Sequence, residues 1–176
     1  MTWTYNQGIV LSGLSKLYKY TGDEGLFTAA ENLIDSVLAS HLVPTNSGVL
    51  VESCDPTGTC NQDNWMFKGI FFEHLGYFLT DITALEELQV TTKKAILQKY
   101  TNFIHANASA VWEGRGSDGR VGNWWAAPTG SQIQRYSVET HGSGVAAVCC
   151  ALRVDELLHS LESTAEGLTL TSQVDG

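Results

Sequence analysis

Apolar residues recur at helical spacing in five separate segments of the chain. These segments cover residues 5–20, 24–42, 64–80, 89–108 and 138–161, and a short extended piece is expected at 49–52. Apolar positions three and four residues apart form one face of an α-helix, and that face is stable only when another element covers it. The pattern therefore predicts an all-α fold in which the helices bury one another.

The first two helices are separated by only three residues, Thr21, Gly22 and Asp23. Gly22 suits the C-terminal cap of the first helix, and Asp23 can cap the start of the second. Two helices with so short a connection form an antiparallel hairpin. Hairpins with polar residues at their junctions predict a toroid or a solenoid. Because no strict repeat period is present, a regular solenoid is the weaker choice.

Length and charge exclude several classes of protein. At about 100–200 residues per domain, the 176 residues predict a single domain with a real core. The 10 lysines and arginines are outnumbered by 19 aspartates and glutamates, which gives a net charge of −9 and disfavours nucleic acid as a partner. No apolar stretch reaches the length of a membrane span, about 18 residues, and residues 1–10 lack the features of a signal peptide.

The cysteines predict one disulfide and no metal site. Cys54 and Cys60 flank a turn that a disulfide can close, which indicates a secretory compartment. Cys149 and Cys150 are adjacent in a helix, where side chains diverge by about 100°, so both are expected to be buried and unpaired. The histidines are scattered, and we expect neither a metal nor a cofactor. Asn107 begins an Asn-Ala-Ser sequon and is a candidate glycosylation site.

Two clusters combine aromatic rings with amide or charged side chains, a mixture that suits sugar binding. Tyr5, Asn6 and Gln7 open the first helix, and Asp63 and Lys68 lie at the start of the third. Ring faces stack on sugar C–H groups, and side-chain amides exchange paired hydrogen bonds with hydroxyls. Both clusters also have a structural interpretation. The first could be a capped helix start with a buried tryptophan. In the second, Asp63 could cap the helix, and Lys68 could pair with Asp63 or with a hydroxyl group of a ligand. The spacing of Asp63 and Lys68 could also be a coincidence at the surface.

A long glycine-rich segment at 113–137 contains two tryptophans, and a third directly precedes it. Loops beyond about 15 residues are more often functional or disordered than idle. Because an exposed tryptophan is costly, each ring either folds back onto the core or forms a stacking platform for a ligand. We expect Trp112 to belong to the core and Trp125 to contact ligand.

The carboxylates that would catalyse a reaction are harder to identify in this sequence than the residues that suit sugar binding. Glycoside hydrolysis usually needs two carboxylates about 5–9.5 Å apart. Glu52 and Asp63 lie at helix junctions and could converge, whereas most other acids lie on helix faces. The chain contains no nucleophile elbow, phosphate-binding loop or dinucleotide fingerprint.

Several motifs together resemble glycoside hydrolase family 76, the endo-α-1,6-mannanases and related fungal cell-wall enzymes. The motifs are Trp3-Thr4-Tyr5-Asn6-Gln7-Gly8, Thr21-Gly22-Asp23, the Cys54 to Cys60 loop, and Asp63 followed by Phe67-Lys68-Gly69-Ile70-Phe71. The similarity extends from Trp3 to about Leu161. The resemblance implies an (α/α)6 toroid of six helical hairpins, of which residues 1–162 would form the C-terminal part, with residues 163–176 as a frayed tail.

The resemblance also implies an activity, the endo-hydrolysis of α-1,6-mannosidic bonds by two adjacent aspartates upstream of the Trp3 motif. No Asp-Asp dipeptide is present in the chain, so we assign no catalytic residue. The expected partner is α-mannan or another cell-wall glycan, and the expected location is extracellular or in the cell wall. The substrate-binding candidates are Tyr5, Asn6, Gln7, Asp63, Lys68 and Trp125. The alternatives are a cell-wall transglycosidase, a non-catalytic carbohydrate-binding module, and an inactive fragment with an open edge.

Overall fold

The computed structural model describes residues 2–128 and 130–174, with residues 164–174 described by their backbone only. Five helices make up the fold: α1 Thr4–Thr21, α2 Glu24–Leu38, α3 Asn64–Thr83, α4 Val90–Glu113 and α5 Val138–Val174. Within this described part no strand is present, and the extended pairing is a single bridge between Gly122 and Tyr136. The prediction of an all-α fold is therefore confirmed.

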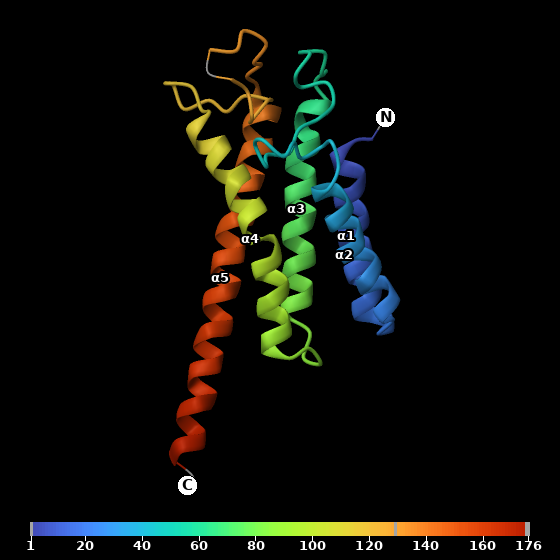
Figure 1. Ribbon diagram of the computed structural model, residues 1–176, viewed down its shortest axis with the longest axis vertical. Coiled ribbons are helices and arrows are strands. Elements are labelled where there is room, and N and C mark those ends of the chain that lie inside the picture. The colour runs from blue at the N-terminus through green and yellow to red at the C-terminus, as the bar shows by residue number, and fades with distance from the viewer. Residues whose placement is uncertain (1, 129, 175–176) are drawn as a thin grey trace.

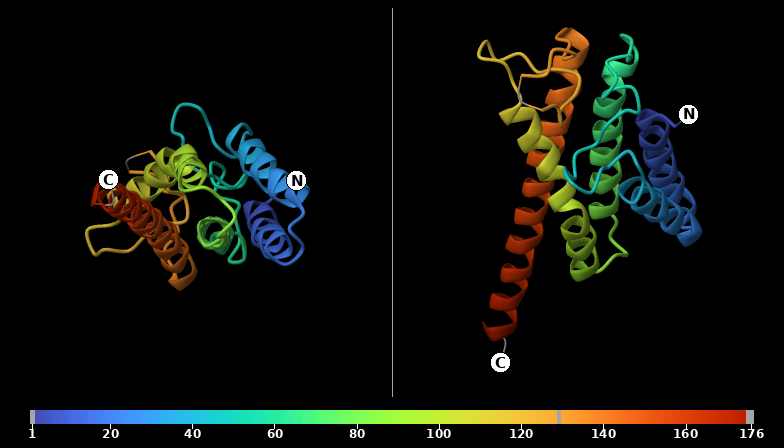
Figure 2. Two further views of the ribbon diagram at one scale, coloured as in Figure 1. Left: turned by 90° about the horizontal axis from the view of Figure 1, so that it is seen from below. Right: turned by 45° about the horizontal axis from the view of Figure 1, so that its top comes forward.

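The helices stand in two rows. α1, α3 and α5 run in the same direction and form one row, with α3 between the other two (Figure 1). α2 packs against α1, and α4 packs against α5, so these two helices form the second row (Figure 2). Each helix of the second row runs opposite to its partner in the first. The fold is thus two rows of helices, joined by the antiparallel pairs α1–α2 and α4–α5.

Two glycines allow the first row to pack closely near its N-terminal ends. A Cβ atom on Gly8 of α1 would lie 2.6 Å from Phe71 Cα of α3. A Cβ atom on Gly69 of α3 would lie 2.5 Å from Ser143 Cα of α5, and the Gly69 N–H donates a hydrogen bond of 2.8 Å to Ser143 Oγ. Both positions therefore require a residue without a side chain.

The core is centred on α3, which is buried on most of its faces, as its apolar sequence predicts. Phe71, Phe72, Leu75, Phe78 and Leu79 are fully buried there. They pack with apolar residues of the other four helices in one continuous cluster. In this chain, the position of α3 between two neighbours explains why apolar residues occur all around the helix.

The turn between α1 and α2 forms as the sequence predicts. Gly22 adopts a left-handed conformation with a φ of 69°, and its N–H donates to Tyr18 O at 2.7 Å. The Asp23 side chain accepts a hydrogen bond of 2.9 Å from the Gly25 N–H at the start of α2. Both caps are confirmed, and they fix the first helical hairpin.

Several helix ends differ from the sequence prediction. α2 ends at Leu38, before the predicted end at residue 42. Leu42 and Val43 are nevertheless buried, because the non-helical segment after α2 folds back onto the core. α5 runs on to Val174, well beyond the predicted end near residue 161, and projects past the other helices (Figure 1). Backbone hydrogen bonds continue a helix where no proline interrupts it, even without apolar periodicity. The predicted frayed tail at 163–176 is thus helical over most of its length, and residues 175–176 lie outside the described part.

The predicted glycosylation at Asn107 is incompatible with the fold. Its side chain is 0% exposed on α4. Asn107 Oδ1 accepts a hydrogen bond of 2.8 Å from the Leu50 N–H, and its Nδ2 donates to Phe103 O at 2.8 Å. The side chain therefore joins the extended piece near Leu50 to α4, and a glycan on its nitrogen would have no room.

The two cysteines of α5 differ in environment. Cys150 is buried, and burial raises the pKa of its thiol to about 12. Cys149 is exposed, so only one of the pair behaves as the expected small buried side chain. Over the described residues, no helix has the length and hydrophobicity that a bilayer crossing requires.

Candidate functional site

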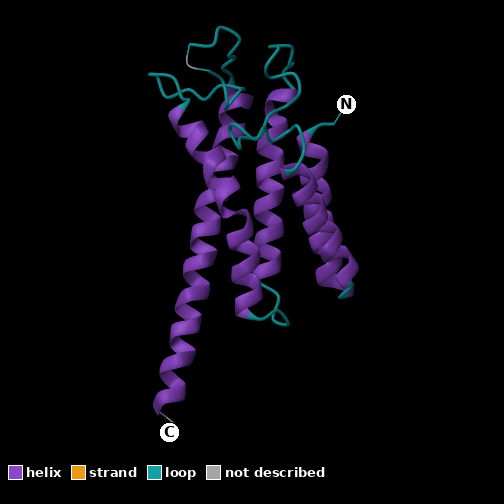
Figure 3. Cartoon of the chain, in the orientation of Figure 1, coloured by secondary structure: helices purple, strands orange, loops and turns teal. Residues whose placement is uncertain are grey.

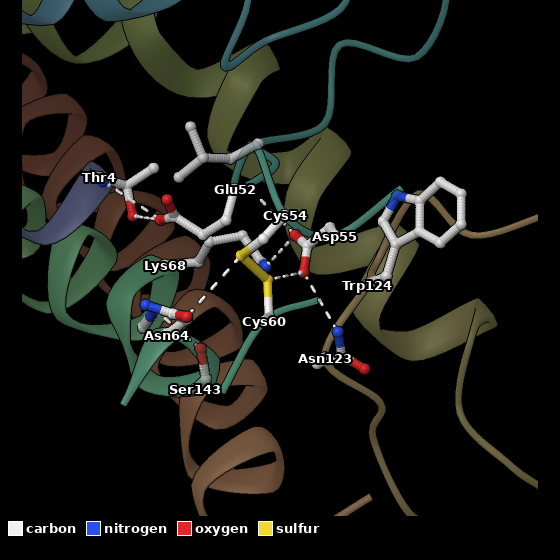
Figure 4. A network of polar contacts seen from close by, with 12 residues as sticks. Thr4, Glu52, Cys54, Asp55, Cys60, Asn64, Lys68, Asn123, Trp124 and Ser143 are labelled. Atoms are coloured by element: carbon white, nitrogen blue, oxygen red, sulfur yellow. Dashed lines mark hydrogen bonds and ion pairs between the residues drawn. A yellow bond between two sulfur atoms is a disulfide. The ribbon is translucent and has the colours of Figure 1, made fainter. Parts of the chain in front are cut away.

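The two long connections of the chain lie at the same end of the molecule. Residues 39–63 and 114–137 gather where α1, α3 and α5 begin (Figure 3). A network of buried polar side chains joins them to the helices at this end (Figure 4). The candidate site is therefore built from three helix N-termini and two loops.

Glu52 connects the first long loop to the start of α1. Glu52 Oε1 accepts hydrogen bonds from the N–H of Thr4, at 3.2 Å, and from the Thr4 hydroxyl. The side chain is 0% exposed, and its Oε2 atom has no hydrogen-bond partner among the described residues. Burial raises the pKa of Glu52 to about 7, although the Thr4 hydrogen bonds and the charge of Lys68 oppose this. Glu52 therefore binds the start of α1 and is covered by the fold, whereas Asp63, its suggested partner, is exposed.

Asp55 and Lys68 form a buried ion pair at the centre of the network. Lys68 Nζ lies 2.5 Å from Asp55 Oδ2, and both side chains are 1% exposed. Asp55 Oδ2 also accepts from the Glu52 N–H at 2.9 Å, and Asp55 Oδ1 accepts from Asn123 Nδ2 at 3.2 Å. Such full hydrogen bonding is what allows a pair of charges to be buried. The predicted pairing of Lys68 with Asp63 is wrong, because Asp55 occupies that role.

The predicted disulfide is confirmed, and it brackets Asp55. Cys54 and Cys60 are bonded, with 4.9 Å between their Cα atoms. Directly after this loop, Asn61 and Asn64 cap the start of α3 reciprocally: the N–H of each donates to the other's Oδ1, at 2.9 and 3.2 Å. Asp63 makes no capping hydrogen bond, so its expected role as the cap is wrong. The paired asparagines satisfy the helix start in its place.

Aromatic rings and amides meet at the surface above this network. The ring centroids of Tyr5 and Phe67 are 4.3 Å apart, and Trp3 contacts the Phe67 ring edge-on at 5.4 Å. Next to them Asn6 is exposed, and Gln7 is half-buried. Asp63 is exposed and lines an open hollow of about 420 Å³ with Asn61, Gln62 and Trp65. Tyr5, Asn6, Gln7 and Asp63 thus have surface at this end, whereas Lys68 lies beneath it.

The tryptophans are placed opposite to expectation. Trp125 is buried, with its ring centroid 5.8 Å from that of Phe72 and 5.4 Å from Lys68 Nζ. Trp112 is 62% exposed, and the Arg115 guanidinium lies 3.8 Å from its ring centroid. The tryptophan expected to contact ligand therefore packs in the core, and the one expected in the core lies at the surface.

The sequence profile of the family described as Glycosyl hydrolase family 76 matches residues 1–162. The chain belongs to this family. The resemblance carried by the Trp3 and Phe67 motifs is thereby confirmed.

Two similar yeast proteins are named as mannan endo-1,6-alpha-mannosidases. The mannan endo-1,6-alpha-mannosidase DCW1 of Candida albicans is 33% identical over 118 residues, which cover 66% of this chain and 24% of that protein. The mannan endo-1,6-alpha-mannosidase DFG5 of Saccharomyces cerevisiae is 30% identical over 128 residues, which cover 68% and 27%. The chain thus spans about a quarter of the length of these two relatives.

A solved family 76 structure shares the fold. The alpha-1,6-mannanase GH76A of Salegentibacter sp. HEL1_6, solved as an inactive variant in complex with alpha-1,6-mannotriose, superposes with a TM-score of 0.66. The two sequences are 22% identical, and the match covers 88% of this chain and 40% of that one. The prediction of a partial α/α toroid built from helical hairpins is confirmed.

Much of the family 76 sequence motif has a structural role in this chain. In the first motif Thr4 binds Glu52, and Gly8 allows α1 to approach α3. In the second motif Lys68 neutralises Asp55, and Gly69 allows α3 to approach α5. Gly8 and Gly69 thus allow the row of helices to pack, and Thr4 and Lys68 bind the first long loop to α1 and α3. Tyr5 is partly exposed and Asn6 is exposed.

Proposed function

We propose that this chain supplies part of the mannan-binding surface of an endo-acting α-1,6-mannosidase. The observation that carries the proposal is the family match over residues 1–162, with relatives named as mannan endo-1,6-alpha-mannosidases. The surface formed by Tyr5, Asn6, Gln7 and Asp63 combines the ring and amide groups that suit a sugar chain. Its position over the starts of α1 and α3 supports this assignment.

Lys68 and Trp125 would support the binding surface from below. Both side chains are buried, so neither offers a face to a glycan in this structure. Lys68 holds Asp55, and Trp125 packs between Lys68 and Phe72. We therefore assign them the role of fixing the two loops that flank the surface.

We assign binding, and not bond cleavage, to the residues of this chain. The solved alpha-1,6-mannanase of Salegentibacter sp. HEL1_6 is an inactive variant in which two adjacent aspartates are replaced by asparagine. The sequence of this chain contains no Asp-Asp dipeptide. The two acids of the polar network already have structural partners: Glu52 caps α1, and Asp55 is neutralised by Lys68. A carboxylate that moves protons for a substrate must reach it within hydrogen-bond distance, and both of these are covered.

Calorimetric titration of the 176-residue chain with α-1,6-mannotriose tests the proposal. We expect saturable heat, and no increase in reducing ends when the chain is incubated with α-1,6-mannan. Absence of heat at millimolar mannotriose would contradict mannan binding. Release of shorter oligosaccharides would contradict our assignment of binding alone, and formation of longer ones would favour a transglycosidase.

An extracellular or cell-wall location is proposed with this function. The disulfide between Cys54 and Cys60 supports it, because such bonds persist in oxidising compartments. Non-reducing mass spectrometry of the protein isolated from its native source should find this bond intact. Two free thiols at these positions would contradict the assignment.

A further inference from the structure

Trp124 is the tryptophan of the glycine-rich loop whose ring stays partly accessible at the end of the molecule where the two long loops meet. It is half-buried, in contrast to the neighbouring Trp125 in the core. We propose that the Trp124 ring is a stacking platform for a hexopyranose unit of the glycan, an inference that rests on the proposed function. The sequence pattern favoured Trp125 for this role.

The backbone of Trp124 is held by three hydrogen bonds. Its N–H donates to Gln134 Oε1 at 2.9 Å, and its carbonyl oxygen accepts from Gln134 Nε2 at 2.8 Å. The same carbonyl oxygen accepts from the Ala127 N–H at 3.2 Å, which closes a turn. A single side-chain amide thus fixes both polar groups of the Trp124 backbone.

The residues on either side of Trp124 are anchored independently. Asn123 Nδ2 donates to the buried Asp55 at 3.2 Å, and Asn123 Oδ1 accepts from the Arg135 N–H at 2.7 Å. The Trp125 ring is buried against Phe72. Since Asp55 is itself held by the Lys68 ion pair in the core, the loop is rigid at the point from which the Trp124 ring extends.

The Trp124 ring lies apart from the polar network that anchors it. In Figure 4 the indole extends to the side of Asn123 away from Lys68 and Glu52. Among the described residues, no aromatic ring or cation stacks on it, whereas Arg115 covers the ring of Trp112 at 3.8 Å. The backbone that carries the Trp124 ring is therefore held in place, and no described residue stacks on the ring.

A half-buried indole on an anchored backbone suits the apolar face of a pyranose ring. Pre-organised aromatic side chains bind at low entropic cost, because the loop that carries them does not have to be ordered on binding. The polar groups next to the ring, Asn123 and the Gln134 amide, already have hydrogen-bond partners. The contact offered to a ligand is therefore the ring face, which can lie against the C–H face of a sugar ring.

Titration of three variants with α-1,6-mannotriose tests the inference. Trp124→Ala should weaken binding about tenfold, and Trp124→Phe, which keeps an aromatic face, should retain most of the affinity. Trp112→Ala is the matched control, because it removes an exposed tryptophan at the C-terminal end of α4. It should leave the affinity within about twofold of wild type.

The outcomes separate this inference from the proposed function. If the unmodified chain does not bind mannotriose at millimolar concentration, both are overturned. If it binds, and Trp124→Ala binds equally well, the stacking role is overturned and mannan binding stands. If Trp124→Ala does not fold, oxidation of the unmodified chain by N-bromosuccinimide decides: mannotriose should slow the oxidation of Trp124 and not that of Trp112. Equal protection or none would overturn the inference.

Discussion

The Lys68 ammonium group lies 2.5 Å from the Asp55 carboxylate, and both side chains are 1% exposed. Asp55 belongs to the disulfide loop and Lys68 to α3, and Asn123 of the second long loop also donates to Asp55. One buried carboxylate thus holds together the two loops and the central helix. The geometry of the whole candidate site depends on this pair.

Removal of one member of the pair should be strongly destabilising. Lys68→Met leaves Asp55 charged and buried, and we expect the free energy of unfolding to fall by about 3–5 kcal/mol. The double variant Lys68→Met with Asp55→Asn removes both charges and keeps an oxygen that can accept a hydrogen bond, so it should recover part of that loss. Urea denaturation followed by circular dichroism measures both. Equal losses in the single and double variants would contradict the role of charge.

Glu52 should make the stability of the fold depend on pH. Its pKa is raised from 4.5 to about 7 in the folded state, so the folded chain holds a proton that the unfolded chain releases between these values. The stability that the neutral Glu52 carboxyl contributes is therefore fully present below about pH 4.5 and is lost as the pH rises to about 7. At about 1.4 kcal/mol per pKa unit, the loss is on the order of 3 kcal/mol.

Glu52→Gln is the matched variant for this effect. The amide keeps an oxygen that accepts from Thr4 but does not ionise, so this part of the pH dependence should disappear. Urea denaturation midpoints of both proteins between pH 4.5 and 8 make the comparison. A wild-type curve that rises between pH 5 and 7, or one identical to that of the variant, would contradict the buried neutral carboxyl.

Close helix contacts should make Gly69 and Gly8 intolerant of a methyl group. Gly69→Ala and Gly8→Ala place a Cβ atom within 2.6 Å of the neighbouring backbone, and we expect each to cost about 1–3 kcal/mol. Gly13→Ala is the control, because the same helix α1 has open space there. That change should stabilise the protein by up to about 1 kcal/mol through helix propensity. Thermal denaturation distinguishes the three variants.

The sequence identifies the helices well, because the pattern of apolar residues at helical spacing includes those that form the core, such as Leu11, Ile34 and Phe71. Other apolar residues of the same pattern, including Leu17 and Tyr20 of α1, are exposed. The cap residues Gly22 and Asp23 and the bond between Cys54 and Cys60 depend on local geometry, and local spacing is sufficient to predict them. The ends of α2 and α5 were not predicted, because turns also bury apolar residues and a helix can continue without them.

The candidate site could be predicted only in part, because its contacts join residues far apart in the chain. Lys68 was noticed as unusual on an apolar helix, but its partner Asp55 lies in a loop with no periodicity. The placement of Trp124 and Trp125 depends on which of two adjacent rings faces Phe72, and spacing cannot decide that. A signal for Asp55 was present in its position between two bonded cysteines, where a loop residue is held rigidly.

Loss of the disulfide should loosen the loop that carries Asp55. Replacing Cys54 and Cys60 by serine removes a cross-link around a short loop, and a chain-entropy estimate gives a loss of about 2 kcal/mol. Cys149→Ser, at an exposed free thiol, is the control and should change stability by less than about 0.5 kcal/mol. Reductant should lower the stability of the wild type and of Cys149→Ser, which both contain the bond, and should not change that of the variant without it.

Asn107 should remain unmodified although it lies in a glycosylation sequon. Its amide is buried and bonded to the Leu50 N–H and the Phe103 carbonyl, so we expect no glycan on the folded protein secreted from a eukaryotic host. Intact mass spectrometry before and after endoglycosidase treatment should give the same mass. Asn107→Ala leaves the Leu50 N–H without a partner and should destabilise the fold by about 1–3 kcal/mol. Ser109→Ala is the control, because it destroys the sequon and leaves these hydrogen bonds in place. A mass decrease after treatment of the wild-type protein, absent in Ser109→Ala, would contradict the burial of Asn107.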